Sequence, residues 1–228
     1  MPRLTWHGHA CFSLRIDSGE HLLVDPYIEG NPAYHGSRED LDDVDWILVS
    51  HGHYDHFGDV IPLAKKTGAT LIGTVEIVSF AKEQGVGKTH GMNIGGAHRF
   101  PFGRVKLTPA LHGGQVEGDE SGKYTTPPTG FLLELEGARI YYSGDTALTM
   151  DMQLLRDRVD LAILPIGDNF TMGPEDAAIA VDFIRPKQVI PVHYNTWPLI
   201  AQDPKEFARL VGKRAQTVIL EPGGSWDF

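Results

Sequence analysis

The chain has 228 residues, a length that suits one substantial domain or at most two small ones. Acidic residues outnumber basic ones by 30 to 20, and the resulting formal net charge of −10 argues against nucleic acid as the main partner, because such a surface repels phosphate at long range. A single cysteine, Cys11, excludes an internal disulfide, and no signal peptide or run of roughly 18 apolar residues is present, so we expect a cytoplasmic protein without membrane insertion.

Taken in chain order, apolar and β-branched runs predict strands at residues 10–16, 21–25, 46–50, 70–73, 105–110, 130–135, 139–143, 161–165, 188–192 and 217–220. Helical patterns predict helices at residues 74–84, 174–184 and 204–211, the last two with a proline in the first turn. The two halves have a similar order of elements, and no linker rich in proline or serine separates them. We therefore predict one domain over residues 1–228, with an α/β fold in which two sheets pack face to face and helices lie outside.

One stretch between predicted strands has no regular pattern. Residues 113–129 are rich in glycine and contain Pro127 and Pro128, which predicts a long loop. Loops of this length in a compact domain are usually functional or disordered.

The densest group of metal-binding residue types follows the predicted strand at 46–50. Four such residues lie within six positions: His51, His53, Asp55 and His56. Side chains two apart in an extended segment point the same way, so His51 and His53 can face one ion while Asp55 and His56 approach from a second direction. Three imidazoles and a carboxylate suit a Zn-like or Mn-like cation.

Six residues cannot complete the coordination of two metals, so further ligands are expected at other strand ends. Three residues qualify, because each follows an apolar strand: His112, Asp145 and His193. Functional side chains are commonly carried by the loops at strand ends.

The ordered series from Asp25 to His193 resembles the motif series of the metallo-β-lactamase superfamily. The resemblance implies a four-layer αβ/βα sandwich with a dinuclear metal site between the inner edges of its sheets. It implies that one metal is held by His51, His53 and His112, the other by Asp55, His56 and His193, and that Asp145 bridges them. It also implies that Asp25 supports the motif loop and does not bind metal.

Three further segments, residues 6–10, 164–173 and 193–196, are similar to a group of small bacterial and archaeal metal-dependent hydrolases related to ascorbate-6-phosphate lactonases. Diiron oxygen-reducing relatives carry glutamate where this chain has His53, which favours hydrolysis here. Mononuclear iron relatives that act on thiols keep the histidines, so that alternative stays open.

We therefore predict an enzyme, a metal-dependent hydrolase that cleaves a small ester, lactone or related bond. The cofactors are two divalent ions, for which the ligands suit Zn best, with Mn or Fe as alternatives. Two ions about 3.5–4 Å apart would share a water and lower its pKa toward ~7, so that hydroxide is the nucleophile. Asp55 is predicted to orient this hydroxide or to relay a proton.

A second set of residues flanks the strand ends that supply the site and is predicted to surround the pocket: His9, Asp168, Asn195 and Thr196. His9 is predicted to donate to a developing oxyanion or to bind a substrate anion. Asp168 has an alternative role, capping the turn before Phe170. Substrate choice is predicted to lie in the loop at 113–129 and around these residues.

Two other functions compete with small-ester hydrolysis. One is a phosphodiesterase that acts on phospholipid or nucleotide substrates, and the other is a metal-binding sensor without turnover, which the filled set of ligand positions disfavours. The expected partner is a small-molecule substrate, an anionic one included. The lactonase relatives assemble, so a homo-oligomer is a further expectation.

Overall fold

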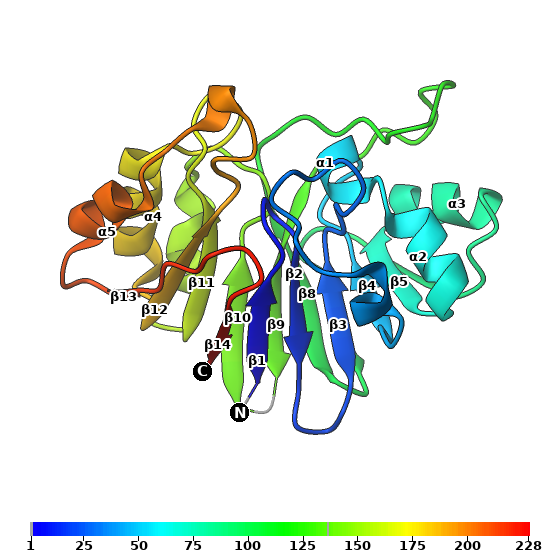
Figure 1. Cartoon of the computed structure of the whole chain (residues 1–228), viewed down its shortest axis with the longest axis horizontal. Helices are drawn as coiled ribbons and strands as arrows, with labels where there is room; N and C mark the ends of the chain where they lie inside the picture. The colour runs from blue at the N-terminus through cyan, green and yellow to red at the C-terminus, as the bar shows by residue number, and fades with distance from the viewer. Residues whose placement is uncertain (1, 136) are drawn as a thin grey trace.

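The computed structural model describes residues 2–135 and 137–228, apart from the side chain of Arg38. Two seven-stranded sheets form its centre (Figure 1). The first sheet has the order β14-β1-β2-β3-β4-β5-β6. Its strands are β1 (Arg3–Trp6), β2 (Phe12–Arg15), β3 (His21–Val24), β4 (Trp46–Leu48), β5 (Thr70–Thr74), β6 (Thr89–Met92) and β14 (Ser225–Asp227).

The second sheet has the order β13-β12-β11-β10-β9-β8-β7. Its strands are β7 (Ala97–Phe100), β8 (Gly103–Pro109), β9 (Thr129–Leu135), β10 (Ala138–Tyr142), β11 (Leu161–Pro165), β12 (Gln188–Val192) and β13 (Gln216–Thr217). In the first sheet, neighbours from β1 to β3 pair antiparallel and neighbours from β3 to β5 pair parallel. In the second sheet, neighbours from β8 to β10 pair antiparallel and neighbours from β10 to β12 pair parallel. Parallel neighbours bring their carboxyl ends to one edge, and this edge carries the motifs.

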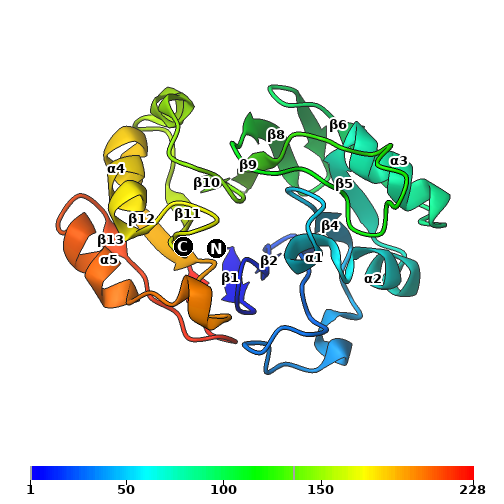
Figure 2. The same ribbon diagram turned by 90° about the horizontal axis from the view of Figure 1, so that it is seen from above.

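Helices cover the outer face of each sheet. The first sheet is flanked by α2 (Val60–Thr67) and α3 (Val75–Glu83), and the second by α4 (Pro174–Ile184) and α5 (Pro204–Val211), as the view from above shows (Figure 2). Shorter pieces are α1 (Tyr54–Phe57) and the 3₁₀ turns η1 (Arg38–Leu41), η2 (Met150–Leu155) and η3 (Pro198–Ile200). This arrangement confirms the predicted four-layer αβ/βα sandwich.

The helices begin where the sequence supplies caps. Thr74 accepts a hydrogen bond from the backbone N–H of Ile77 at the start of α3, and Asp203 accepts one from Lys205 at the start of α5. Such caps satisfy donors that have no partner within the helix. The buried side chains of α5, Phe207 and Val211, lie one turn apart and face the sheet.

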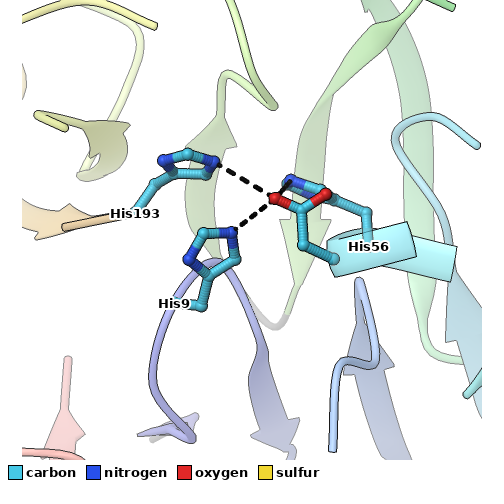
Figure 3. A group of neighbouring side chains, drawn as sticks. His9, His56 and His193 are labelled. Carbon is cyan, nitrogen blue, oxygen red and sulfur yellow. Dashed lines mark hydrogen bonds and ion pairs between the residues drawn. The ribbon is translucent and has the colours of Figure 1, made fainter. Parts of the chain in front are cut away.

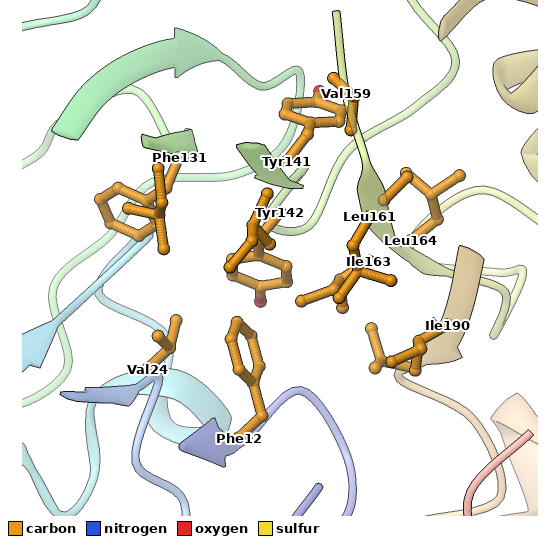
Figure 4. Packing of buried hydrophobic residues seen from close by; sticks show 14 of the residues in the cluster. Phe12, Val24, Phe131, Tyr141, Tyr142, Val159, Leu161, Ile163, Leu164 and Ile190 are labelled. Carbon is orange, nitrogen blue, oxygen red and sulfur yellow. The ribbon is translucent and has the colours of Figure 1, made fainter. Parts of the chain in front are cut away.

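The core between the two sheets combines aliphatic side chains with several aromatic ones (Figure 4). The ring of Phe12 meets that of Tyr142 edge to face, with centroids 5.2 Å apart, and Phe131 stacks on the other side of Tyr142. A second apolar cluster joins the first sheet to α2 and α3. The sheets are thus held rigidly below the edge that bears the motifs.

Several elements were not predicted from the sequence. They are β1, β6, β7, β14, α1 and α2, and the strand predicted at 217–220 is only the two-residue β13. Strands β6 and β7 read Thr-His-Gly-Met and Ala-His-Arg-Phe, with little apolar periodicity, because they are the outermost strands of their sheets. The helices at 174–184 and 204–211 have the predicted bounds, and residues 110–128 form the predicted irregular loop.

Within residues 2–135 and 137–228, no helix is both long enough and apolar enough to cross a lipid bilayer.

Candidate metal centre

The first motif lies just beyond β4. His51 is fully buried, His53 sits at the N-terminal cap of α1, and α1 itself carries Asp55 and His56. Gly52 is required between the two histidines, because a Cβ there would lie 2.5 Å from the Cα of Val116 in the long loop.

The other predicted ligands come from three strand ends of the second sheet. His112 follows β8, Asp145 follows β10 and His193 follows β12 directly. Gly144 has a φ of +63°, and a Cβ at this position would meet the carbonyl oxygen of Thr129 at 2.5 Å. The turn that presents Asp145 therefore needs glycine.

One group of ring nitrogens is formed by His51, His53 and His112, whose nearest ligand atoms all lie within 4.8 Å of one another. Nδ1 of His53 is 3.0 Å from Nε2 of His51 and 3.3 Å from Nε2 of His112. These are the residues that the resemblance assigns to one metal.

A second group contains the residues assigned to the other metal together with one more histidine: Asp55, His56, His193 and His9. Oδ2 of Asp55 is 2.9 Å from Nε2 of His9 and 3.7 Å from Nε2 of His193. Figure 3 shows the rings of His9, His56 and His193 converging from different elements.

Asp145 lies between the two groups. Its Oδ2 atom is 3.0 Å from Nε2 of His193, 3.2 Å from Nε2 of His56 and 3.7 Å from Nε2 of His112. A third set of ligand atoms that fits one ion consists of His51, His56 and Asp145. The carboxylate is thus within reach of ions held by either group.

Several of these buried atoms have no hydrogen-bond partner among the described residues. They include Nε2 of His56, Nε2 of His193 and Oδ1 of Asp145. Buried polar atoms are rarely left unpaired, because the loss of water is uncompensated. Imidazole nitrogens and carboxylate oxygens aimed at a common point are the donor set of a Zn-like ion, so the residues present fit the metal that the motifs imply.

The electrostatics of the cluster favour positive charge. Burial lowers the pKa of His51 well below its ordinary value, which leaves a neutral imidazole. Burial opposes ionisation of Asp145, but the neighbouring His193 and His56 outweigh it and hold the pKa of this carboxyl well below its usual range. Burial likewise lowers the pKa of His193, yet the carboxylate of Asp145 outweighs it and raises that pKa to about 9. The carboxylates thus attract a cation or, in its place, protons.

Asp25 orients two of the histidines from behind. Its Oδ2 accepts hydrogen bonds from Nδ1 of His56 at 2.8 Å, from Oγ of Ser50 at 2.6 Å and from the hydroxyl of Tyr142 at 2.6 Å. Ser50 Oγ in turn lies 3.0 Å from Nδ1 of His51. With Nδ1 engaged, each ring presents Nε2 to the site. Asp25 therefore supports the motif loop, and it is absent from the three ligand groups, as the resemblance implied.

His9 differs from its predicted place at the substrate. The residue is fully buried, with a φ of +54°, and its ring bridges two side chains. Nδ1 lies 2.6 Å from Oγ1 of Thr196, while Nε2 contacts Asp55. Its carbonyl oxygen accepts hydrogen bonds from Nε1 of Trp6 and the backbone N–H of His193. His9 and Thr196 therefore lie behind Asp55, outside the pocket.

A pocket of about 370 Å³ opens above the cluster. It is lined by Tyr27, His53, Tyr54, Asp55, His112, Asp145, Phe170, His193 and Trp197. The sequence had not assigned a role in the site to Tyr27, Tyr54 or Trp197. Tyr54 lies inside the histidine motif and Trp197 follows Thr196 directly, so proximity to the motifs was the available signal.

Two predicted pocket residues do not line it. Asp168 is exposed, and its Oδ1 accepts a hydrogen bond from the N–H of Asn169 at 2.8 Å in the turn before Phe170, the alternative foreseen for it. Asn195 is also exposed, and its Oδ1 accepts from the N–H of Gln202 at 2.8 Å. Both side chains stabilise the loops that carry Phe170 and Trp197.

The long loop at 113–129 lies mostly over the first half of the chain (Figure 1). Val116 and Tyr124 are buried in the cluster around α3, and Tyr124 contacts Glu83. None of the described residues from 113 to 129 lines the pocket. The walls of the pocket come from other parts of the described chain.

Comparisons with known proteins agree with this geometry. A family model described as "Beta-lactamase superfamily domain" matches residues 20–194. A UPF0173 metal-dependent hydrolase of Enterococcus faecalis is 47% identical over 223 residues, covering 96% of this chain and 97% of the relative. A UPF0173 metal-dependent hydrolase of Geobacillus sp. (strain WCH70) is 48% identical over 224 residues, covering 97% of each chain.

Solved structures are similar over the whole chain. Igni18, a metallo hydrolase from the hyperthermophilic archaeon Ignicoccus hospitalis, has a TM-score of 0.88 and 33% identity, covering 100% of this chain and 99% of its own. An isothiocyanate hydrolase from Delia radicum gut bacteria has a TM-score of 0.78, covering 99% and 98% of the two chains, but its 18% identity shows the fold alone. The relation to ascorbate-6-phosphate lactonases is not tested by these comparisons and stays a prediction.

Proposed function

The chain belongs to the metallo-β-lactamase superfamily and is a metal-dependent hydrolase, and from that premise we propose that it holds two divalent metal ions and cleaves a small ester, lactone or related bond. The observation that carries the proposal is the position of Asp145, whose Oδ2 lies 3.0 Å from Nε2 of His193 in one histidine group and 3.7 Å from Nε2 of His112 in the other. A carboxylate between two sets of imidazoles is well placed to be shared by two ions.

In this proposal His51, His53 and His112 hold one ion, Asp55, His56 and His193 hold the other, and Asp145 is shared. When bound, the ions supply Lewis acidity, which lowers the pKa of water and polarises the substrate's carbonyl oxygen. Zn is the metal we propose, because neutral imidazoles predominate among the ligands.

The chain's own residues orient the reacting groups. Asp55 lines the pocket and also faces His9, so its carboxylate can accept a proton from an attacking water. Asp25 and Ser50 hold the rings of His56 and His51, which keeps their Nε2 atoms directed at the centre.

We assign His9 and Thr196 the role of positioning residues. Because an ionised carboxylate can only accept, we assign the proton of His9 to Nε2, which then donates to Oδ2 of Asp55, and the hydroxyl of Thr196 becomes the donor to Nδ1. This hydrogen bond fixes Oδ2 of Asp55, the same oxygen that faces His193 and His56. A direct contact of His9 with substrate is not supported, because its side chain is buried.

The proposal is tested with the purified chain loaded with Zn or Mn and offered three substrates, a γ-lactone, a p-nitrophenyl ester and bis-p-nitrophenyl phosphate. We expect turnover of the ester or the lactone that a chelator abolishes and added metal restores. Preferential turnover of the phosphodiester would replace this proposal with a phosphodiesterase. Metal binding without turnover of any of the three would favour a sensor.

A further inference from the structure

We propose that the pocket selects substrates that carry an uncharged aromatic or planar apolar group next to the bond that is cleaved. This inference rests on the proposed hydrolytic function and names the substrate class of the same site. It is carried by the four aromatic residues of the wall, Tyr27, Tyr54, Phe170 and Trp197, and by the charges that the lining lacks.

The aromatic wall is assembled from separate loops and presents carbon rather than polar atoms. The rings of Tyr27 and Tyr54 meet edge to face with centroids 5.5 Å apart. Their hydroxyls are already engaged, since Tyr27 donates to the carbonyl of Gly30 at 2.8 Å and Tyr54 to that of Glu29 at 3.0 Å. Hydrogen bonds outside the pocket therefore fix the orientation of the two rings, and the apolar surfaces of the rings remain available to contact a ligand.

Two of these rings form an exposed apolar rim. Phe170 is 47% exposed and Tyr54 is 46% exposed, although large apolar side chains at such exposure lose favourable burial. A planar apolar group that enters between them and Trp197 would recover this burial. A volume of about 370 Å³ is near the lower end of the range for ligand pockets, so one ring and a short substituent fill it.

The charge of the wall excludes a remote anion. None of the described lining residues is lysine or arginine, and the chain as a whole carries a formal charge of −10. A carboxylate or phosphate distant from the reacting bond would lose water and find no cationic partner, which is unfavourable.

A remote cation is disfavoured for a different reason. Aromatic faces attract ammonium groups, and an aromatic wall alone would permit such a ligand. Here, however, the only carboxylates among the described lining residues are Asp55 and Asp145, which the proposed function assigns to the metals, so a remote ammonium group would find no anionic partner. An uncharged group avoids both penalties.

The test uses the Zn-loaded protein and three benzohydroxamates that differ only in the para substituent: tert-butyl, sulfonate or trimethylammonium. The hydroxamate anchors each probe at the metal, and the substituents have similar shape and size but different charge. Isothermal titration calorimetry measures the three dissociation constants. We expect the tert-butyl probe to bind at least tenfold more tightly than either charged probe.

Two variants sharpen the measurement. Phe170→Arg places a cation on the rim, and we expect it to improve binding of the sulfonate probe relative to the tert-butyl probe at least tenfold. Ile179→Arg adds the same charge at an exposed position of α4 outside the lining, and we expect it to leave the order of affinities unchanged. Both sites are exposed, so neither substitution disturbs the core.

The inference is overturned if a charged probe binds as tightly as the tert-butyl probe, if no probe binds, or if Ile179→Arg shifts the preference as much as Phe170→Arg. These results do not depend on turnover. Ester hydrolysis with equal binding of the probes would reject the pocket's selectivity and keep the proposed function. Selective binding of the tert-butyl probe without turnover of any ester would keep the selectivity and reject hydrolysis of that class.

Discussion

Asp145 is the side chain on which the proposed metal pair depends most. It is almost fully buried, and three imidazole nitrogens lie within 3.7 Å of its Oδ2 atom. Its Oδ2 atom thus lies within 3.7 Å of a nitrogen from each of the two histidine groups, His112 in one and His193 in the other. Removal of this carboxylate takes away a negative charge that lies within 3.2 Å of the buried Nε2 atoms of His56 and His193.

We therefore expect Asp145→Ala to lose most of its bound metal and at least a hundredfold in turnover. Metal content is measured by elemental analysis after gel filtration, and turnover with the ester that the wild type cleaves. The matched control is Asp151→Ala in η2, which removes an exposed carboxylate nearby in the sequence. Full metal content with normal turnover would refute a shared role for Asp145.

His9 is a second single residue whose role can be tested, and in our proposal it acts by positioning Asp55. We expect His9→Ala to weaken binding of the more loosely held metal by 10–100-fold, the usual effect of losing a residue that orients a ligand. His9→Gln retains an amide donor toward Asp55 and should recover most of this affinity. Competition with a fluorescent metal chelator measures both constants without reference to activity.

The control for His9 is His35→Ala, since His35 is exposed and lies outside the ligand groups. A merely structural role for His9 predicts that Gln and Ala variants bind metal equally well. That outcome would remove His9 from the positioning residues.

At the level of elements, the strand ends of the two sheets supply the ligands and the long loop packs across the first motif. The backbone N–H of Glu117 donates to the carbonyl of Gly52 at 2.7 Å, and that of Thr126 donates to the carbonyl of Gly114. The loop therefore covers the turn between His51 and His53. Its contribution is to hold this turn, while the pocket wall is supplied elsewhere.

Gly52→Ala tests this contact between elements. The new Cβ would lie 2.5 Å from Cα of Val116 and 2.8 Å from the carbonyl oxygen of Gln115, and both are backbone atoms that cannot rotate away. We expect a loss of about 1–3 kcal/mol in the free energy of unfolding, as for other overpacked sites. Urea unfolding of the metal-free protein measures it.

Gly87→Ala is the control, because a Cβ at position 87 meets nothing within 4 Å. It should change the free energy of unfolding by less than about 0.5 kcal/mol. Equal stabilities of the Gly52→Ala variant and the wild type would mean that the loop yields freely at this contact.

At the level of the whole molecule, the cluster ties the two sheets together across the top of the sandwich. His51, His53 and His56 belong to the first sheet's side, whereas His112, Asp145 and His193 belong to the second. An ion bound by both sets links the two halves. Metal binding is thus coupled to the packing of the sheets.

We expect removal of the metal to lower the melting temperature by roughly 5–10 °C, because saturation at 100 times Kd contributes about 2.7 kcal/mol in a chain of this size. Differential scanning calorimetry with and without a chelator measures the shift. Readdition of Zn should reverse it. An unchanged melting temperature, with metal content shown to differ, would contradict this coupling.

The order of residue types along the chain was enough to predict the fold and to propose which residues form the candidate site. His51 to His56, His112, Asp145 and His193 were identified because metal chemistry requires these side chains at strand ends, and buried strands have apolar periodicity that can be read directly. Edge strands such as β6 and β7 were not predicted, because a strand that has one neighbour and is partly exposed needs little apolar periodicity.

The surroundings of the candidate ligands could not be predicted from the sequence, because they depend on how the two sheets pack. Tyr27, Tyr54, Phe170 and Trp197 are far apart in the chain, and no local periodicity marks them as one wall. The same holds for His9, whose partner Thr196 is 187 positions away and whose burial depends on packing between the two halves. Ligand identity is a property of single side chains, whereas pocket shape and hydrogen-bond partners arise from contacts that exist only after the sheets have packed.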